Sequence, residues 1–117
     1  MTAAHKVVDV AFLLDRPPED APTTGVVSLH QSEHAQWSLL RVAAGARWEA
    51  PPVEGESSFV VLEGNATFNV EGWRRTLGSG HLMHVAGGHA VSVDNDGNEP
   101  LSALLTVACP AQAAAAG

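Results

Sequence analysis

Six histidines are the residues of this chain best suited to acid–base chemistry. An imidazole titrates near neutral pH, so it can take up or release a proton during a reaction, and it is also a common metal ligand. Three of the six crowd one glycine-rich segment: His81, His84 and His89. We predict His84 and His89 as catalytic residues, because the strands expected around them would bring both toward one end of the fold. The alternative is that each is a surface or rim residue, the commoner role of a lone histidine on a short strand.

Carboxylates would supply the other half of an acid–base pair. Glu54 and Glu56 stand in a run rich in proline and glycine, and Glu49 precedes it. A one-residue shift of a strand turns each side chain to the opposite face, so the direction of Glu56 depends on the register. The alternative interpretation is that these acids are loop residues exposed to water.

Short runs of β-branched and apolar residues, separated by turn residues at nearly even spacing, predict the elements that would position these groups. The expected strands are 25–30, 35–44, 58–62, 66–70, 73–77, 81–85, 89–93 and 101–108, with an extended run broken by turns at 46–57. Glu71–Gly72 predicts a hairpin turn, and 94–100 a loop. Val7–Leu14 is either a first strand or a short helical turn, and the prolines after it end any regular structure. The pattern indicates an antiparallel sandwich or barrel.

Two segments punctuated by glycine, 45–64 and 80–95, resemble the two signature motifs of the cupin family of small β-barrels. The first motif carries His-x-His and Glu between two glycines, and the second carries Pro-x-Gly, a His and a closing Asn. Read from Gly45, the first spacing falls on Pro51, Val53, Ser57 and Gly64. Read from Gly80, the second spacing falls on Ala86, Gly88, Val91 and Asn95. The motif glycines and the closing asparagine are in place, whereas the positions of the family's metal ligands hold Pro51, Val53, Ser57 and Val91.

The resemblance implies an all-β fold, a single cupin-like antiparallel β-barrel (jelly roll) with a short N-terminal arm. Its parts would be an arm and proline-rich linker (1–24), the barrel (25–108) and an alanine-rich tail (109–117). In many such barrels the arm pairs with a second subunit, so a homodimer is expected. Proline and valine offer a metal no side-chain lone pair, and a neutral serine hydroxyl is a poor ligand. We therefore expect neither the usual metal site nor another cofactor.

Strand alternation predicts which residues face the barrel interior, because residues two apart share a face of a strand. The inward set would include Ala66, Phe68 and Val70. The residues predicted to line a ligand pocket are Val53, Ser57, Phe59, Val61, Val91 and Val93. Such a lining suits a small apolar or aromatic molecule, since an unpaired polar group there would be costly. A core filled by side chains, with no pocket, is the alternative.

Composition narrows the class of protein. A hydrophobic fraction of 45% with 16% charged residues predicts one folded domain. The formal net charge of -7 argues against nucleic acid or an anionic membrane as a partner, since phosphates need clustered lysine and arginine. The single cysteine, Cys109, rules out an internal disulfide. No apolar run is long enough to span a bilayer and no secretory leader is recognisable, so a cytoplasmic protein is expected.

Three hypotheses for the function follow. The first is binding of a small molecule without a metal, which includes activity as a cyclase or isomerase assisted by His84 or His89. The second is a metal-dependent dioxygenase or lyase whose ligands come from His81, His84, His89 and one of Glu54 or Glu56. The third is a non-catalytic dimeric module with a filled barrel. Because the cupin fold hosts many reactions, it does not decide whether the chain is an enzyme.

Overall fold

The computed structural model describes residues 6–15 and 23–108. Within them the chain forms one short helix, α1 (Val10–Asp15), and nine strands. The strands are β1 (Gly25–Gln31), β2 (Ala35–Val42), β3 (Arg47–Ala50), β4 (Ser57–Glu63), β5 (Asn65–Val70), β6 (Trp73–Gly78), β7 (Leu82–Val85), β8 (Val91–Asp94) and β9 (Leu101–Ala108). The predicted all-β class is therefore confirmed.

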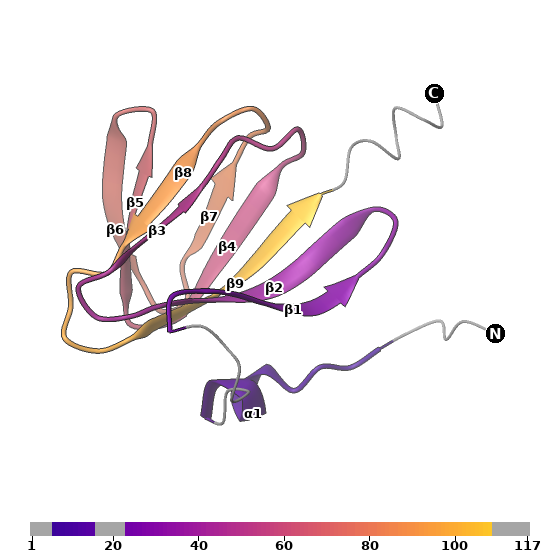
Figure 1. Cartoon of the computed structure of the whole chain (residues 1–117), viewed down its shortest axis with the longest axis horizontal. Coiled ribbons are helices and arrows are strands. Elements are labelled where there is room, and N and C mark those ends of the chain that lie inside the picture. Colours follow the sequence, from indigo (N-terminus) through magenta and orange to yellow (C-terminus); the bar gives the residue numbers. More distant parts are fainter. Residues whose placement is uncertain (1–5, 16–22, 109–117) are drawn as a thin grey trace.

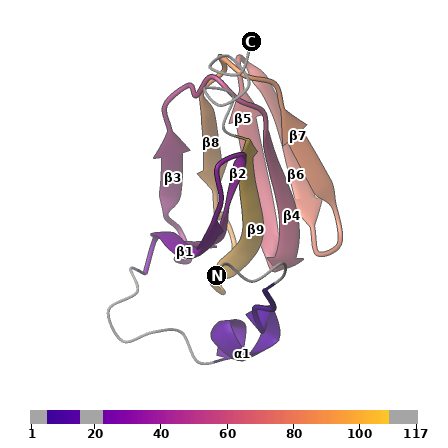
Figure 2. The same cartoon turned by 90° about the vertical axis from the view of Figure 1, so that its right-hand side faces the viewer.

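The strands form two antiparallel sheets that face each other. One sheet has five strands in the order β1-β2-β9-β4-β7, and the other has four in the order β3-β8-β5-β6. Figure 1 shows the four-stranded sheet on the left and the five-stranded sheet on the right, and Figure 2 shows the same layers from the side. The chain crosses repeatedly between the sheets, as in a jelly roll, which confirms the predicted architecture.

The β5–β6 hairpin turns where the sequence predicts it. Glu71 and Gly72 have φ values of 48° and 84°, and Val70 pairs directly with Trp73. Two consecutive left-handed residues match the twist of the flanking strands, and glycine takes this conformation without a steric cost.

The core lies between the two sheets and follows the predicted alternation. Phe59, Val61, Phe68 and Val93 are each at most 1% exposed. The remaining core members include Leu40, Val42, Ala66, Leu77, Val85, Val91, Leu101, Ala103 and Leu105. The inward orientation predicted for β4, β5 and β8 is therefore correct.

Asn95, the closing residue of the second motif, has a structural role. It is 2% exposed, and its Nδ2 donates to the carbonyl oxygens of Val42 (2.9 Å) and Glu99 (2.8 Å). Its Oδ1 accepts a hydrogen bond from the backbone N–H of Gly97 (3.0 Å). One amide side chain thus joins β2 to the 95–99 turn, a structural role that needs no metal.

The N-terminal arm ends in a helical turn, one of the two predicted alternatives. Asp9 Oδ1 accepts a hydrogen bond from the backbone N–H of Phe12 (3.0 Å), the usual arrangement of an N-cap. Lys6 Nζ donates to the carbonyl oxygen of Leu29 (3.1 Å) and so joins the arm to β1.

Some expectations differ from the structure or fall outside it. The extended run at 46–57 contains a paired strand, β3, and β8 ends at Asp94, which the sequence had suggested was the first loop residue. The predicted alanine-rich tail (109–117), Cys109 and part of the predicted arm and linker lie outside the described residues. Within 6–15 and 23–108, no helix has the length and apolar character needed to cross a membrane.

Candidate functional site

Two loops meet at one end of the barrel, where β3 and β7 finish and β4 and β8 begin. These loops, 51–56 and 86–90, pass over the top of the barrel in Figure 1. The backbone N–H of Gly88 donates to the carbonyl oxygen of Val53 (2.7 Å). A Cβ on Gly87 would lie 2.1 Å from the carbonyl oxygen of Glu54, so only glycine fits this contact. We call this region the loop end of the barrel.

A hollow of about 570 Å³ opens at the loop end beside the four-stranded sheet. It is lined by Glu49, Ala50, Pro51, Asn69, Glu71, Ala90, Val91 and Ser92, and we call it the Glu71 hollow. Glu49, Ser92 and Asn69 lie opposite one another on three adjacent strands. They alternate with core residues and therefore face outward. Alanine, proline and valine form the apolar part of the lining, and the two carboxylates, the amide and the hydroxyl form the polar part.

Glu71, which lines this hollow, forms a close pair with His89, the chain neighbour of the lining residue Ala90. His89 Nδ1 lies 2.6 Å from Glu71 Oε1, and the histidine side chain is 37% exposed. An ionised carboxylate only accepts hydrogen bonds, so Nδ1 is the donor in this contact, and in the neutral form of such a ring the free lone pair is on Nε2. His89, which we predicted to be catalytic, thus lies beside the carboxylate of Glu71. The sequence did not indicate this contact.

His84 lies at the loop end beside the other sheet. It shares a hollow of about 210 Å³ with Ala35, Glu56, Ser57, Ser58, Thr106 and Ala108. His84 Nε2 lies 3.5 Å from Glu56 Oε1, and both side chains are more than half exposed, so the pair is weak. The structure brings predicted residues His84 and Ser57 together here, but on the far side of the loops from the Glu71 hollow.

Phe59, one of the residues predicted to line an interior pocket, packs against two aromatic rings. The ring centroid of Phe59 lies 5.2 Å from that of Phe68 and 6.1 Å from that of Trp48. Val61 and Val93 are also fully buried, whereas Val53, in the 51–56 loop, is 39% exposed. Their role in binding a ligand stays a prediction.

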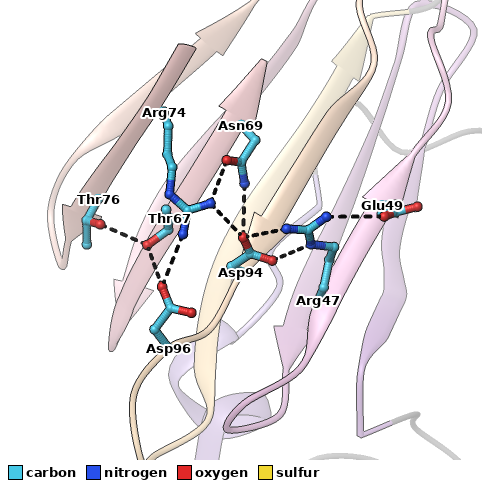
Figure 3. Close-up of polar contacts among 8 residues, drawn as sticks. All are labelled: Arg47, Glu49, Thr67, Asn69, Arg74, Thr76, Asp94 and Asp96. Carbon is cyan, nitrogen blue, oxygen red and sulfur yellow. Dashed lines mark hydrogen bonds and ion pairs between the residues drawn. The ribbon is translucent and has the colours of Figure 1, made fainter. Parts of the chain in front are cut away.

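A network of charged side chains lies on the outer face of the four-stranded sheet (Figure 3). The sequence did not predict it. Arg47 holds Asp94 through both carboxylate oxygens, and Asp94 Oδ2 also accepts from Asn69 Nδ2 (3.1 Å) and Arg74 Nη1 (3.1 Å). The hydrogen bond from Arg47 is the main reason why the pKa of Asp94 is lowered. The same contact raises the pKa of Arg47.

This network positions the polar lining of the Glu71 hollow. Asn69 Oδ1 accepts from Arg74 Nη1 (2.8 Å), and Glu49 Oε1 lies 3.7 Å from Arg47 Nη1. The amide of Asn69 is therefore fixed from both ends, which leaves it one N–H and one lone pair for a ligand. The outward direction of Asn69 was predictable from alternation, but its partners on two other strands, Arg74 on β6 and Asp94 on β8, were not.

The described residues do not assemble the unconventional metal site of the second hypothesis. No three His, Cys, Asp or Glu side chains among residues 6–15 and 23–108 come close enough to hold a metal ion. The His81 ring bonds the carbonyl oxygen of Gly78 (2.9 Å), and His84 and His89 contact different glutamates.

Comparison with solved structures shows many proteins of the same shape. A Bacillus halodurans protein has 18% identity, with 90% of this chain and 81% of that chain covered and a TM-score of 0.76. A cupin family protein with a double-stranded β-helix fold from Methanocaldococcus jannaschii has 17% identity, with 99% and 100% covered and a TM-score of 0.74. The cupin domain of Schizosaccharomyces pombe Cnp3 has 24% identity and a TM-score of 0.67, with 71% of this chain and 62% of that one covered. No family model matches the sequence, and no curated protein is significantly similar to it. Identities this low show a shared fold only.

Proposed function

We propose that this chain, whose fold is that of the cupins, binds a small organic molecule in the Glu71 hollow and moves a proton on it. The observation that carries the proposal is the 2.6 Å contact between His89 Nδ1 and Oε1 of Glu71, a residue that lines a hollow with an apolar and a polar part. A histidine held by a carboxylate is a common general base, because the carboxylate fixes the tautomer and stabilises the imidazolium that forms.

The lining of the hollow defines the class of ligand. Ala50, Pro51 and Val91 suit an apolar or aromatic body. The carboxylates of Glu49 and Glu71 favour a neutral or cationic ligand with hydroxyl or amine donors, because an anion would be repelled. A phenol or an aryl amine has both features.

The chemistry that these residues support is acid–base catalysis. Nε2 of His89 accepts a proton from the ligand, Glu71 stabilises the resulting charge, and the same nitrogen returns the proton to another atom of the ligand. Proton transfer of this kind isomerises or cyclises an activated organic molecule. His84 and Glu56 lie beside the other sheet and take no part in this step.

The test combines a ligand screen with an exchange measurement. Phenols and aryl amines are titrated into ¹⁵N-labelled protein, and we expect shift changes at residues 49–51, 69–71 and 89–92. Transfer of solvent deuterium into the bound compound is then followed by mass spectrometry. His89→Gln should abolish the exchange and keep the binding, whereas His34→Gln, an exposed turn histidine, should change neither. Shift changes confined to other residues, or exchange that survives His89→Gln, would contradict the proposal.

The packed interior favours a second function, that of a non-catalytic dimeric module. Phe59 and Phe68 fill the middle of the barrel, as a module with no internal ligand requires. Absence of any binding in the screen, together with a dimeric mass by light scattering, would support this alternative.

A further inference from the structure

A groove of about 420 Å³ lies between the N-terminal arm and the outer face of the five-stranded sheet. It is lined by Lys6, Val8, Val10, Leu29, His30, Trp37 and Leu104, and we call it the arm groove. None of these residues belongs to the Glu71 hollow or to the core cluster. Its volume is in the range usual for small-molecule sites.

The sheet side of the arm groove is largely apolar, with Leu29, Trp37 and Leu104 in its lining. Leu104 lies opposite Leu39 on β2 and Val60 on β4. Leu39 alternates with the core residue Leu40 and so points to the outer face, yet it is only 1% exposed. A side chain on an outer face is buried to this extent only where another segment lies over it, and the arm residues Val8 and Val10 border the same groove.

The rim of the groove carries two basic side chains. Lys6 is the only lysine of the chain, and its Nζ donates one of its three hydrogen bonds to the Leu29 carbonyl oxygen (3.1 Å). The His30 ring packs against Trp37 at a tilt, with a centroid separation of 5.4 Å. Within residues 6–15 and 23–108, neither Lys6 nor His30 has a carboxylate at ion-pair distance.

We infer that the arm groove binds an alkyl carboxylate. The chain occupies the aliphatic wall formed by Val8, Val10 and Leu104, and the carboxylate accepts hydrogen bonds from the two remaining Lys6 donors. The single ammonium group of Lys6 can pair with one carboxylate. Its positive charge is in contrast to the formal net charge of the protein, which is -7. The site is independent of the proposed function at the Glu71 hollow.

The unique lysine makes the test direct. Protein labelled with ¹³C at lysine Cε gives one side-chain signal, and octanoate should shift it in a saturable way. Octan-1-ol has the same apolar body without the charge, and acetate has the charge without the body. We expect octanoate to bind about tenfold more tightly than octan-1-ol, the size of one charge-assisted hydrogen bond, and acetate not to bind.

Variants separate the two parts of the site. Lys6→Gln, read by backbone ¹⁵N shifts, should weaken octanoate about tenfold and leave octan-1-ol unchanged. Arg75→Gln removes an exposed cation on β6 and should leave both affinities unchanged. No octanoate binding, equal affinity for octan-1-ol, or an unchanged octanoate affinity in Lys6→Gln would each overturn the inference. Because Lys6 is exposed, its substitution does not threaten folding.

Discussion

At the scale of single residues, Asp94 shows how a buried carboxylate is kept ionised. Its side chain is 10% exposed and accepts hydrogen bonds from Arg47, Asn69 and Arg74. Its pKa is lowered from the ordinary value of 3.8, chiefly by the hydrogen bond from Arg47. A lowered folded-state pKa means that ionised Asp94 favours the folded state above pH 3.8, and that this contribution is lost as the pH falls through the folded-state pKa.

Replacing this carboxylate should therefore cost stability in a pH-dependent way. We expect Asp94→Asn to lower the free energy of unfolding by about 1–3 kcal/mol at pH 7, because it removes a charged acceptor while keeping the side-chain size. The difference from wild type should narrow below pH 3.8. Urea unfolding at several pH values measures it. Asp96→Asn, whose carboxylate is 69% exposed, is the control and should change stability by only a few tenths of a kcal/mol.

At the scale of elements, the contact between the two loops at the loop end depends on a glycine. A Cβ on Gly87 would meet the carbonyl oxygen of Glu54 at 2.1 Å, and backbone atoms cannot move aside as a flexible side chain can. We expect Gly87→Ala to separate the loops, to weaken the bond from Gly88 N–H to Val53 O, and to lower the free energy of unfolding by about 1–3 kcal/mol. Amide hydrogen exchange at Gly88 should accelerate.

Gly97→Ala is the matched control for this prediction. A Cβ at Gly97 would lie 3.4 Å from Asn95 Oδ1, an ordinary contact, so little change in stability is expected. Unchanged exchange at Gly88 in Gly87→Ala would show that the loops do not depend on this close approach.

The elements themselves were largely predictable, because turn residues and alternation are local signals. Turn residues such as Gly64 and Glu71–Gly72, with the apolar runs that such turns separate, predict the strands of both sheets nearly to their ends, except β3. Asp94 was assigned to a loop because Asp-Asn-Asp-Gly is typical of turns. Its network joins β3, β5, β6 and β8, and such partners depend on strand register, which one sequence does not contain. His84 and His89 lie near the loop end of the barrel, and their catalytic role stays a prediction. Glu71 could not be recognised as a partner of His89 from the sequence, because this contact forms only when the barrel closes.

At the scale of the whole molecule, the two outer faces differ in chemistry. The four-stranded sheet carries the Arg47–Asp94–Arg74 network, whereas the five-stranded sheet carries apolar residues such as Leu39 and Leu104. Leu39 faces outward, but its side chain is buried within its own chain. The homodimer implied by the resemblance stays a prediction.

The barrel interior decides between a filled module and an internal binding site. Phe59 is 1% exposed and packs on Phe68 and Trp48, so Phe59→Ala should lower the free energy of unfolding by about 3–5 kcal/mol. Val53→Ala changes another predicted pocket residue, but this side chain is 39% exposed, and we expect an effect within about 0.5 kcal/mol. Because truncating Phe59 leaves an apolar cavity, benzene should bind to the variant and not to wild type in an NMR titration. A cost below about 1 kcal/mol for Phe59→Ala, or benzene binding inside the wild-type barrel, would instead show an interior open to ligands.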